Sequence, residues 1–178
     1  MKVCIDAGHG GSDPGAVNEK LSLQEKDIVL DISMILADML DYTVVMTRET
    51  DRYLSLTDRC MTANTAGADI FVSVHTNAFH AAEAEGIEVL HWPGSERGIK
   101  LAELLQVKLV HELEWRNRGI KGRDDLAVLR GTNMPAALAE IGFISNPKEG
   151  KAMQACNFRR KAAKALRLGI NNYIKEVR

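Results

Sequence analysis

The sequence has few cysteines, and no two of them lie close together. Cys4, Cys60 and Cys156 are the only three in 178 residues. Disulfide frameworks and cysteine-based zinc sites depend on several closely spaced cysteines, so this pattern argues against both. We expect three free thiols, and we interpret Cys4 as a small core residue because it lies within an apolar run.

Long apolar runs are also lacking, and the N-terminus opens directly into a strand-like pattern, MKVCIDAGHG. No stretch is long enough for a membrane span or a secretory signal, so we expect neither membrane insertion nor export through such a signal. The protein would then be made in the cytoplasm and released by lysis, unless the chain is a domain excised from an exported protein.

Neither sign of charge dominates, since 23 Lys and Arg face 24 Asp and Glu. Residues 141–178 are the exception, with nine basic residues against two acidic ones. A basic segment of this kind can attract nucleic acid or wall phosphate, but it also fits the solvated face of an amphipathic helix. We favour the helix face and expect no nucleic-acid partner.

Apolar residues make up 46% of the chain, enough for one globular domain with a core. Short β-branched runs alternate with helical spacing of apolar residues, which indicates an α/β fold. We predict a mostly parallel central sheet of about six strands, flanked by helices on both faces. The expected strands are 2–6, 43–47, 69–76, 86–92, 126–130 and 135–143, and the expected helices are 27–40, 54–66, 95–115 and a C-terminal one.

Three groups that handle metals or protons lie at predicted strand ends, where open α/β sheets bind their ligands. His9 follows the first strand, His75 closes the third, and Glu140 lies near the end of the 135–143 run. Taken singly, His9 could be a loop histidine and His75 a core histidine bonded to a carbonyl. Glu140 is harder to explain structurally, because its neighbours are almost entirely apolar and glutamate is rarely buried unpaired.

Two imidazoles and one carboxylate are a normal ligand set for a catalytic zinc, and a second carboxylate nearby would serve as general base. The spacing is long-range, unlike H-E-x-x-H, so spacing alone makes a metal site only plausible. Glu25 has a structural interpretation as well, because Ser22-Leu-Gln-Glu25 is a good capping-box pattern for the start of a helix.

Five separated motifs carry a resemblance that runs nearly end to end. They are IDAGHGGSDPGA, LQEKDIVLDI, MTRETDRYLSLTDR, ADIFVSVHTNA and PAALAEIGFISN, in that order. With these motifs the sequence resembles the zinc-dependent N-acetylmuramoyl-L-alanine amidases of the amidase type 3 group. The resemblance implies that residues 1–178 form an amidase catalytic domain, which we expect to be monomeric.

The resemblance also implies the site and the substrate. Zinc would be held by His9, Glu25 and His75, and Glu140 would be the catalytic carboxylate acting on water. The substrate would be peptidoglycan, cut at the amide between the lactyl group of N-acetylmuramic acid and the L-alanine of the stem peptide. For Glu25 the implied ligand role overrides the capping box, although both roles could coexist in one first helical turn.

Other residues and functions stay open on the sequence alone. Arg48 and Arg59 could orient the groups around the metal or form surface ion pairs, and Asn77 could position substrate or close a turn. His80, His91 and His111 match no motif, and we interpret them as ordinary histidines. The alternative enzyme is a zinc peptidase of similar fold, which the same chemistry permits. A nucleotide-binding loop at GHGGSDPG lacks the expected glycine and lysine patterns, and the intact Glu140 argues against a non-catalytic binding module.

Overall fold

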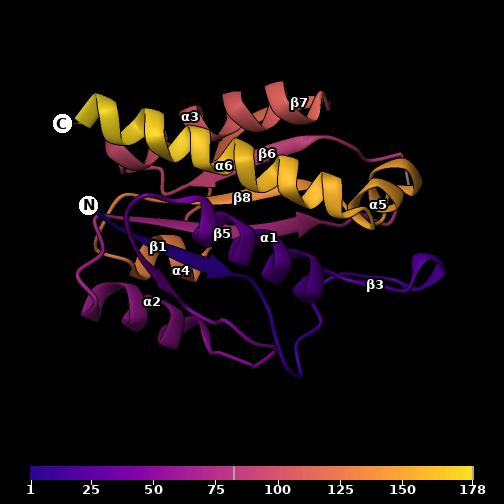
Figure 1. Cartoon of the computed structure of the whole chain (residues 1–178), viewed down its shortest axis with the longest axis horizontal. Helices are drawn as coiled ribbons and strands as arrows, with labels where there is room; N and C mark the ends of the chain where they lie inside the picture. The colour runs from indigo at the N-terminus through magenta and orange to yellow at the C-terminus, as the bar shows by residue number, and fades with distance from the viewer. Residues whose placement is uncertain (82, 178) are drawn as a thin grey trace.

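The computed structural model describes residues 1–81 and 83–177. Its strands are β1 (Lys2–Ala7), β2 (Val17–Asn18), β3 (Leu23–Gln24), β4 (Thr43–Met46), β5 (Ile70–Asn77), β6 (Ile87–His91), β7 (Asn117–Gly122) and β8 (Ala136–Phe143). Its helices are α1 (Glu25–Met39), α2 (Leu56–Thr65), α3 (Glu96–Leu113), α4 (Ala127–Gly131), α5 (Pro147–Met153) and α6 (Cys156–Val177), with a 3-10 turn at Glu19–Leu21. Figure 1 shows their arrangement.

Six strands form one sheet in the order β4-β1-β5-β8-β6-β7. The first four run parallel to one another, whereas β6 runs antiparallel to β8 and β7 runs parallel to β6. The predicted six-stranded, mostly parallel sheet is therefore confirmed. The carboxyl ends of β1, β5 and β8 meet at one edge of this sheet, which is where a ligand is expected.

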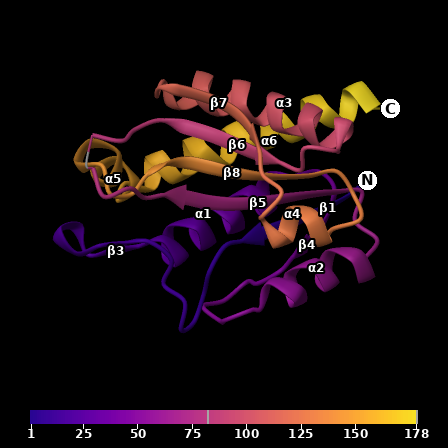
Figure 2. The same ribbon diagram turned by 180° about the vertical axis from the view of Figure 1, so that it is seen from behind.

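Helices cover both faces of the sheet, as the sequence predicted. Helices α1, α3 and α6 pack against one another and against one face of the sheet, and α2 and α4 lie on the opposite face (Figures 1 and 2). Alternate strand residues point to opposite faces, so Val3 and Ile5 join the larger core while Cys4 joins the smaller one beside α2 and α4. Cys4 and Cys60 are buried and Cys156 is exposed, and all three are free, as expected.

The basic C-terminal segment is mostly the exposed side of α6. Its apolar side packs against α1 and α3, and two of its cations pair with acids of those helices, Arg159 with Asp31 and Lys164 with Glu112. This arrangement matches the interpretation of a solvated helix face. Among the described residues, no helix is both long enough and apolar enough to span a bilayer.

One predicted strand is wrong. Residues 126–130 begin the short helix α4, and the sixth strand is instead β7, Asn117–Gly122. Val128 and Leu129 of α4 are buried against the smaller core, so tertiary packing decides the structure of this short apolar run. β7 escaped prediction because it is an edge strand of sequence NRGIKG, with too few apolar residues to give an alternating pattern.

Candidate metal centre and active site

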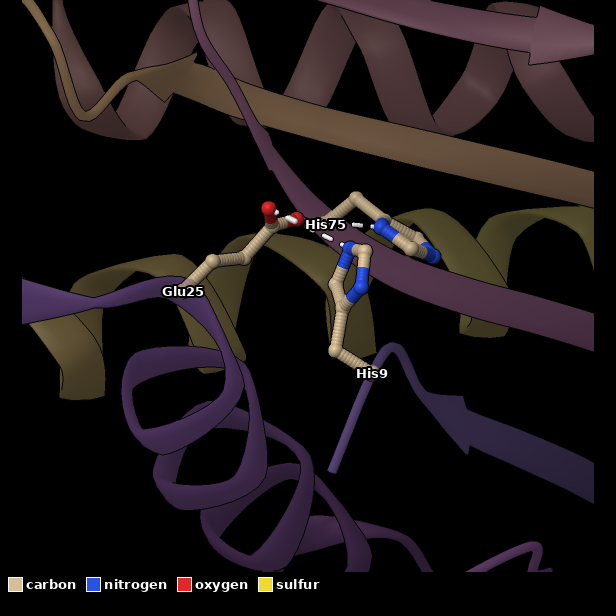
Figure 3. Close-up of side chains that lie close together, drawn as sticks. All are labelled: His9, Glu25 and His75. Carbon is tan, nitrogen blue, oxygen red and sulfur yellow. Dashed lines mark hydrogen bonds and ion pairs between the residues drawn. The ribbon is translucent and has the colours of Figure 1, made fainter. Parts of the chain in front are cut away.

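Three side chains from distant parts of the chain converge at the carboxyl edge of the sheet (Figure 3). His9 follows β1, Glu25 is the first residue of α1, and His75 lies near the end of β5. His9 Nε2 lies 3.2 Å from Glu25 Oε2, and His75 Nδ1 lies 3.0 Å from Glu25 Oε1. One potential ligand atom from each residue falls within a group no wider than 4.8 Å. The structure thus brings together the three residues named as zinc ligands.

Glycines let the backbone come close enough to build this group. A Cβ on Gly8 would lie 2.3 Å from His75 Cε1, and one on Gly15 would lie 2.7 Å from both Glu25 Oε2 and His9 Cδ2. Gly15 also has a φ of 64°, a conformation that side chains disfavour. His9 itself has a φ of 59°, so the loop is strained at one of the three candidate ligands.

The capping box expected at Ser22 is wrong. Gln24 is the N-cap residue of α1 and makes no side-chain cap, while Ser22 ends the preceding 3-10 turn in a left-handed conformation. The Glu25 carboxylate is directed away from that role. Its Oε1 accepts a hydrogen bond from the Thr76 backbone N–H at 2.8 Å, and its Oε2 accepts one from Ala16 N–H at 2.9 Å.

The charges of this group are strongly coupled. Burial opposes ionisation of Glu25, but the hydrogen bonds and charges of His75 and His9 outweigh it and hold its pKa well below the ordinary range. Burial alone would lower the pKa of His9, yet Glu25 and Asp13 raise it to about 9. The pKa of His75 is raised in the same way, chiefly by Glu25. The Glu25 carboxylate therefore favours a positive charge beside it.

The donor set fits a zinc ion, and so do the two spacings between imidazole and carboxylate atoms. Ligands about 2.0–2.1 Å from a tetrahedral zinc lie about 3.3 Å from one another, close to the 3.2 and 3.0 Å between the imidazole and carboxylate atoms. Asp13, which the sequence analysis missed, lies 2.8 Å from His9 Nδ1 and so fixes the ring with Nε2 toward Glu25. Its position four residues after His9 in the same glycine-rich loop was the available signal.

Glu140 lies next to His75 on the neighbouring strand. The two are register partners in the β5–β8 pair, and on its other side Glu140 faces Glu88 of β6. Within the part of the chain that the structure describes, the buried Oε2 of Glu140 has no hydrogen-bond partner. Burial, with smaller contributions from the charges of Glu25 and Glu88, raises the pKa of Glu140 to about 7 despite the opposing effect of His75. A carboxyl group that titrates near neutrality can both accept and return a proton.

A cleft of about 350 Å³ opens over this edge of the sheet. Its lining includes His9 and His75 together with Leu138 of β8, Tyr53 and Leu126. Its size is in the range of pockets that hold small ligands, and its lining combines apolar walls with a few polar groups. The cleft gives a substrate access to the imidazoles.

Comparison with known proteins identifies the family. The family model described as N-acetylmuramoyl-L-alanine amidase matches residues 3–172. The chain belongs to this family. It is 37% identical over 89% of its length to the N-acetylmuramoyl-L-alanine amidase CwlM of Bacillus licheniformis and 38% identical over 88% to the endolysin of Bacillus phage SPP1. It spans 62% and 59% of those two relatives.

A solved structure from the same family has the same fold as this chain. The crystal structure of N-acetylmuramoyl-L-alanine amidase from Clostridium difficile 630 superposes with a TM-score of 0.93 and 36% sequence identity. The match covers 98% of this chain and 96% of the other. The resemblance noted from the sequence motifs is therefore confirmed as family membership and as fold.

Arg48 is buried rather than paired on the surface. Its guanidinium donates to the backbone carbonyls of Ala7 (2.9 Å), Gly8 (2.7 Å) and Lys26 (2.8 Å). It thereby ties the residues before His9 to the first turn of α1, which carries Glu25. Two roles were considered for Arg48, orienting the groups around the site or forming a surface ion pair. Only the orienting role agrees with this geometry.

Arg59 is buried as well and forms an ion pair with buried Asp6 at 2.8 Å. Its other bonds go to the carbonyls of Ala7 (2.7 Å) and His9 (2.6 Å). The surface ion pair considered for this residue is wrong, because neither partner is exposed. Arg59 holds the backbone of His9 directly, and its charge is balanced within the core by Asp6.

Asn77 has defined partners near this edge of the sheet. Asn77 donates to Glu88 Oε1 at 3.2 Å and accepts from the Ala78 N–H, so it links the end of β5 to β6. His80 and His111 are exposed, and His91 is buried with Nδ1 3.1 Å from the Trp92 carbonyl. These three histidines lie outside the group of potential metal ligands, as the sequence analysis expected.

Proposed function

We propose that this chain hydrolyses peptidoglycan at the amide between N-acetylmuramic acid and the L-alanine of the stem peptide, in a zinc-dependent reaction. Membership of the N-acetylmuramoyl-L-alanine amidase family supports the substrate and the bond. The observation that carries the mechanism is the convergence of His9, Glu25 and His75 beside Glu140, with the two histidines lining an open cleft. The bacterial cell wall is then the place of action.

In this proposal His9, Glu25 and His75 hold the zinc. When bound, zinc supplies a Lewis acid that polarises the scissile carbonyl and activates water near neutral pH. The protein prepares the site through Asp13, which fixes the His9 ring, and through the backbone N–H groups that fix the Glu25 carboxylate. Three protein ligands leave room for water and substrate, as catalytic zinc sites require.

Glu140 handles the protons in this proposal. Its carboxylate takes a proton from the attacking water and returns it to the nitrogen of the leaving L-alanine. The absence of a hydrogen-bond partner on Oε2, within the described residues, leaves that atom available for the transfer. Because Glu140 is the register partner of His75, it would lie next to the proposed metal, and it is not part of the group of potential ligands.

Two measurements on the purified protein test the proposal together. Zinc content should be about one ion per chain and should fall sharply in His75→Ala, because two ligands make an incomplete shell. Purified sacculi should release peptides with a new N-terminal L-alanine, and chelator should stop the release. Release of peptides with other N-termini would favour the zinc peptidase, and full activity in chelator would exclude the metal mechanism.

A further inference from the structure

A second charged group lies one strand beyond Glu140. Glu88 of β6 forms two ion pairs through its Oε2 atom. Arg118 Nε and Lys121 Nζ of β7 each lie 2.6 Å from this oxygen. Asn77 donates to its other oxygen, and the Arg118 guanidinium lies 4.9 Å above the Phe143 ring. We call Glu88, Arg118 and Lys121 the β6–β7 cluster. The contacts described above give it no part in the proposed hydrolysis.

The β6–β7 cluster continues the row of side chains that contains the site. Glu88 is the register partner of Glu140, which in turn is the partner of His75. Leu90 and Leu138, two residues from Glu88 and Glu140, belong to the core under α2 and α4, so both acids belong to that face of the sheet. Strands lie about 4.8 Å apart, so the backbone of Glu88 is about 10 Å from that of His75.

The charges of the cluster do not cancel. One carboxylate faces two cations, so the cluster has a surplus of one positive charge. Arg118 alone would neutralise buried Glu88, and Lys121 is therefore the surplus cation. Its side chain is 42% exposed, and it uses only one of its three N–H groups on a partner within the described chain. Glu88 holds this ammonium in place while leaving it able to donate again.

We propose that the β6–β7 cluster is a subsite that binds a carboxylate of the peptide on the leaving-group side of the scissile amide. The inference rests on the proposed function, in which Glu140 returns a proton to the leaving nitrogen. Because Glu140 lies between His75 and Glu88 in the sheet, we assign the leaving peptide to the Glu88 side. An extended peptide advances about 3.4 Å per residue, so about three residues span the distance from His75 to Glu88. A single carboxylate matches the surplus of one positive charge.

The test uses two short N-acetylmuramoyl peptides that differ only in whether the peptide carboxylates are free or amidated. The wild-type protein should cleave the free form with a kcat/KM about tenfold higher, mainly through KM, as expected for one charge-assisted hydrogen bond. Lys121→Gln should lose this preference. The matched control is Lys164→Gln, which removes an ion-paired, exposed lysine on α6 and should keep the preference.

Binding of the released peptides, measured by calorimetry, separates the subsite from the hydrolysis. The free form should bind the wild-type protein more tightly than the amidated form, and Lys121→Gln should bind both alike. Equal binding and equal cleavage of the two forms by the wild-type protein would overturn the subsite and leave the amidase proposal intact. Cleavage of neither form, with the binding preference retained, would overturn the proposed function instead.

Discussion

Replacing Glu140 by glutamine should stabilise the metal-free protein while removing its activity. The carboxyl group of Glu140 is buried among Glu25 and Glu88, and burial raises its pKa to about 7 from an ordinary value of 4.5. The folded state therefore holds a proton on Glu140 at pH values where the unfolded chain has released it. Because the folded state binds this proton more tightly than the unfolded state does, the wild-type protein must lose stability as the pH rises from 4.5 through 7.

The magnitude follows from the two pKa values. Each pH unit between them is worth about 1.4 kcal/mol, so ionised Glu140 costs about 3 kcal/mol of folding free energy above pH 7. Glutamine has nearly the same shape and cannot ionise, so Glu140→Gln avoids this cost. Both proteins bury a neutral group at this position at pH 5. The difference in stability at pH 5 therefore measures the cost of that burial, and it can be subtracted from the difference at pH 8. A bound cation would favour the ionised form, so the measurement must be made in excess chelator.

Urea unfolding followed by circular dichroism measures the difference at pH 5 and pH 8. Glu140→Gln should match the wild-type protein within about 1 kcal/mol at pH 5 and exceed it by about 3 kcal/mol at pH 8, while hydrolysis of sacculi falls about 10²–10⁴-fold. The matched control is Glu88→Gln, one strand away. Burial opposes ionisation of Glu88, but Arg118 and Lys121 hold its pKa below the ordinary value, so its loss should destabilise the protein at both pH values. The loss should be somewhat smaller at pH 8, because removing the Glu88 charge also lowers the pKa of Glu140. Identical pH dependence in wild-type and Glu140→Gln proteins would refute the reasoning.

Three further predictions concern the metal. Glu25→Ala should lose zinc and activity while Ser22→Ala keeps both, and equal zinc content by atomic absorption would return Glu25 to a structural role. Because the metal-free pKa of His9 is about 9 and a ligand imidazole must be neutral, zinc binding at pH 7 should release protons and tighten as the pH rises toward 9. Calorimetric heats that do not depend on the ionisation enthalpy of the buffer would contradict this. Gly15→Ala should weaken zinc binding about tenfold or more, since its Cβ would meet Glu25 and His9, whereas Gly67→Ala has a similar φ in open space and should not.

Site residues could be predicted from the sequence most securely where a residue had no good structural explanation at its position. Glu140 stood out because a lone acid in an apolar strand is costly, and the structure places it beside His75 with a buried, unpartnered oxygen within the described chain. The spatial grouping of His9, Glu25 and His75 agrees with the ligand set implied by the family motifs, and their binding of zinc remains a prediction.

What the sequence could not give depends on long-range packing. The pattern at Ser22 and Glu25 is a good local cap, but α1 begins too late for Ser22 to serve it, because the chain first makes a 3-10 turn. Arg48 could not be assigned from sequence, since arginine is usually exposed and its carbonyl partners come from two separate segments. Such partners become visible only when the sheet has brought β1 and α1 together.

Strand register makes the chemistry of this edge depend on the whole sheet. His75, Glu140 and Glu88 form one row only because β5, β8 and β6 pair in a single register. A slip of one residue in β8 would place Ala139 or Ile141 beside His75 and bury the Glu140 carboxylate in the larger core, among apolar side chains. That alternative buries a charge without a partner, so the proposed catalytic residue also disfavours the wrong register. The polar row and the apolar residues on either side of it in β8 therefore specify the same fold.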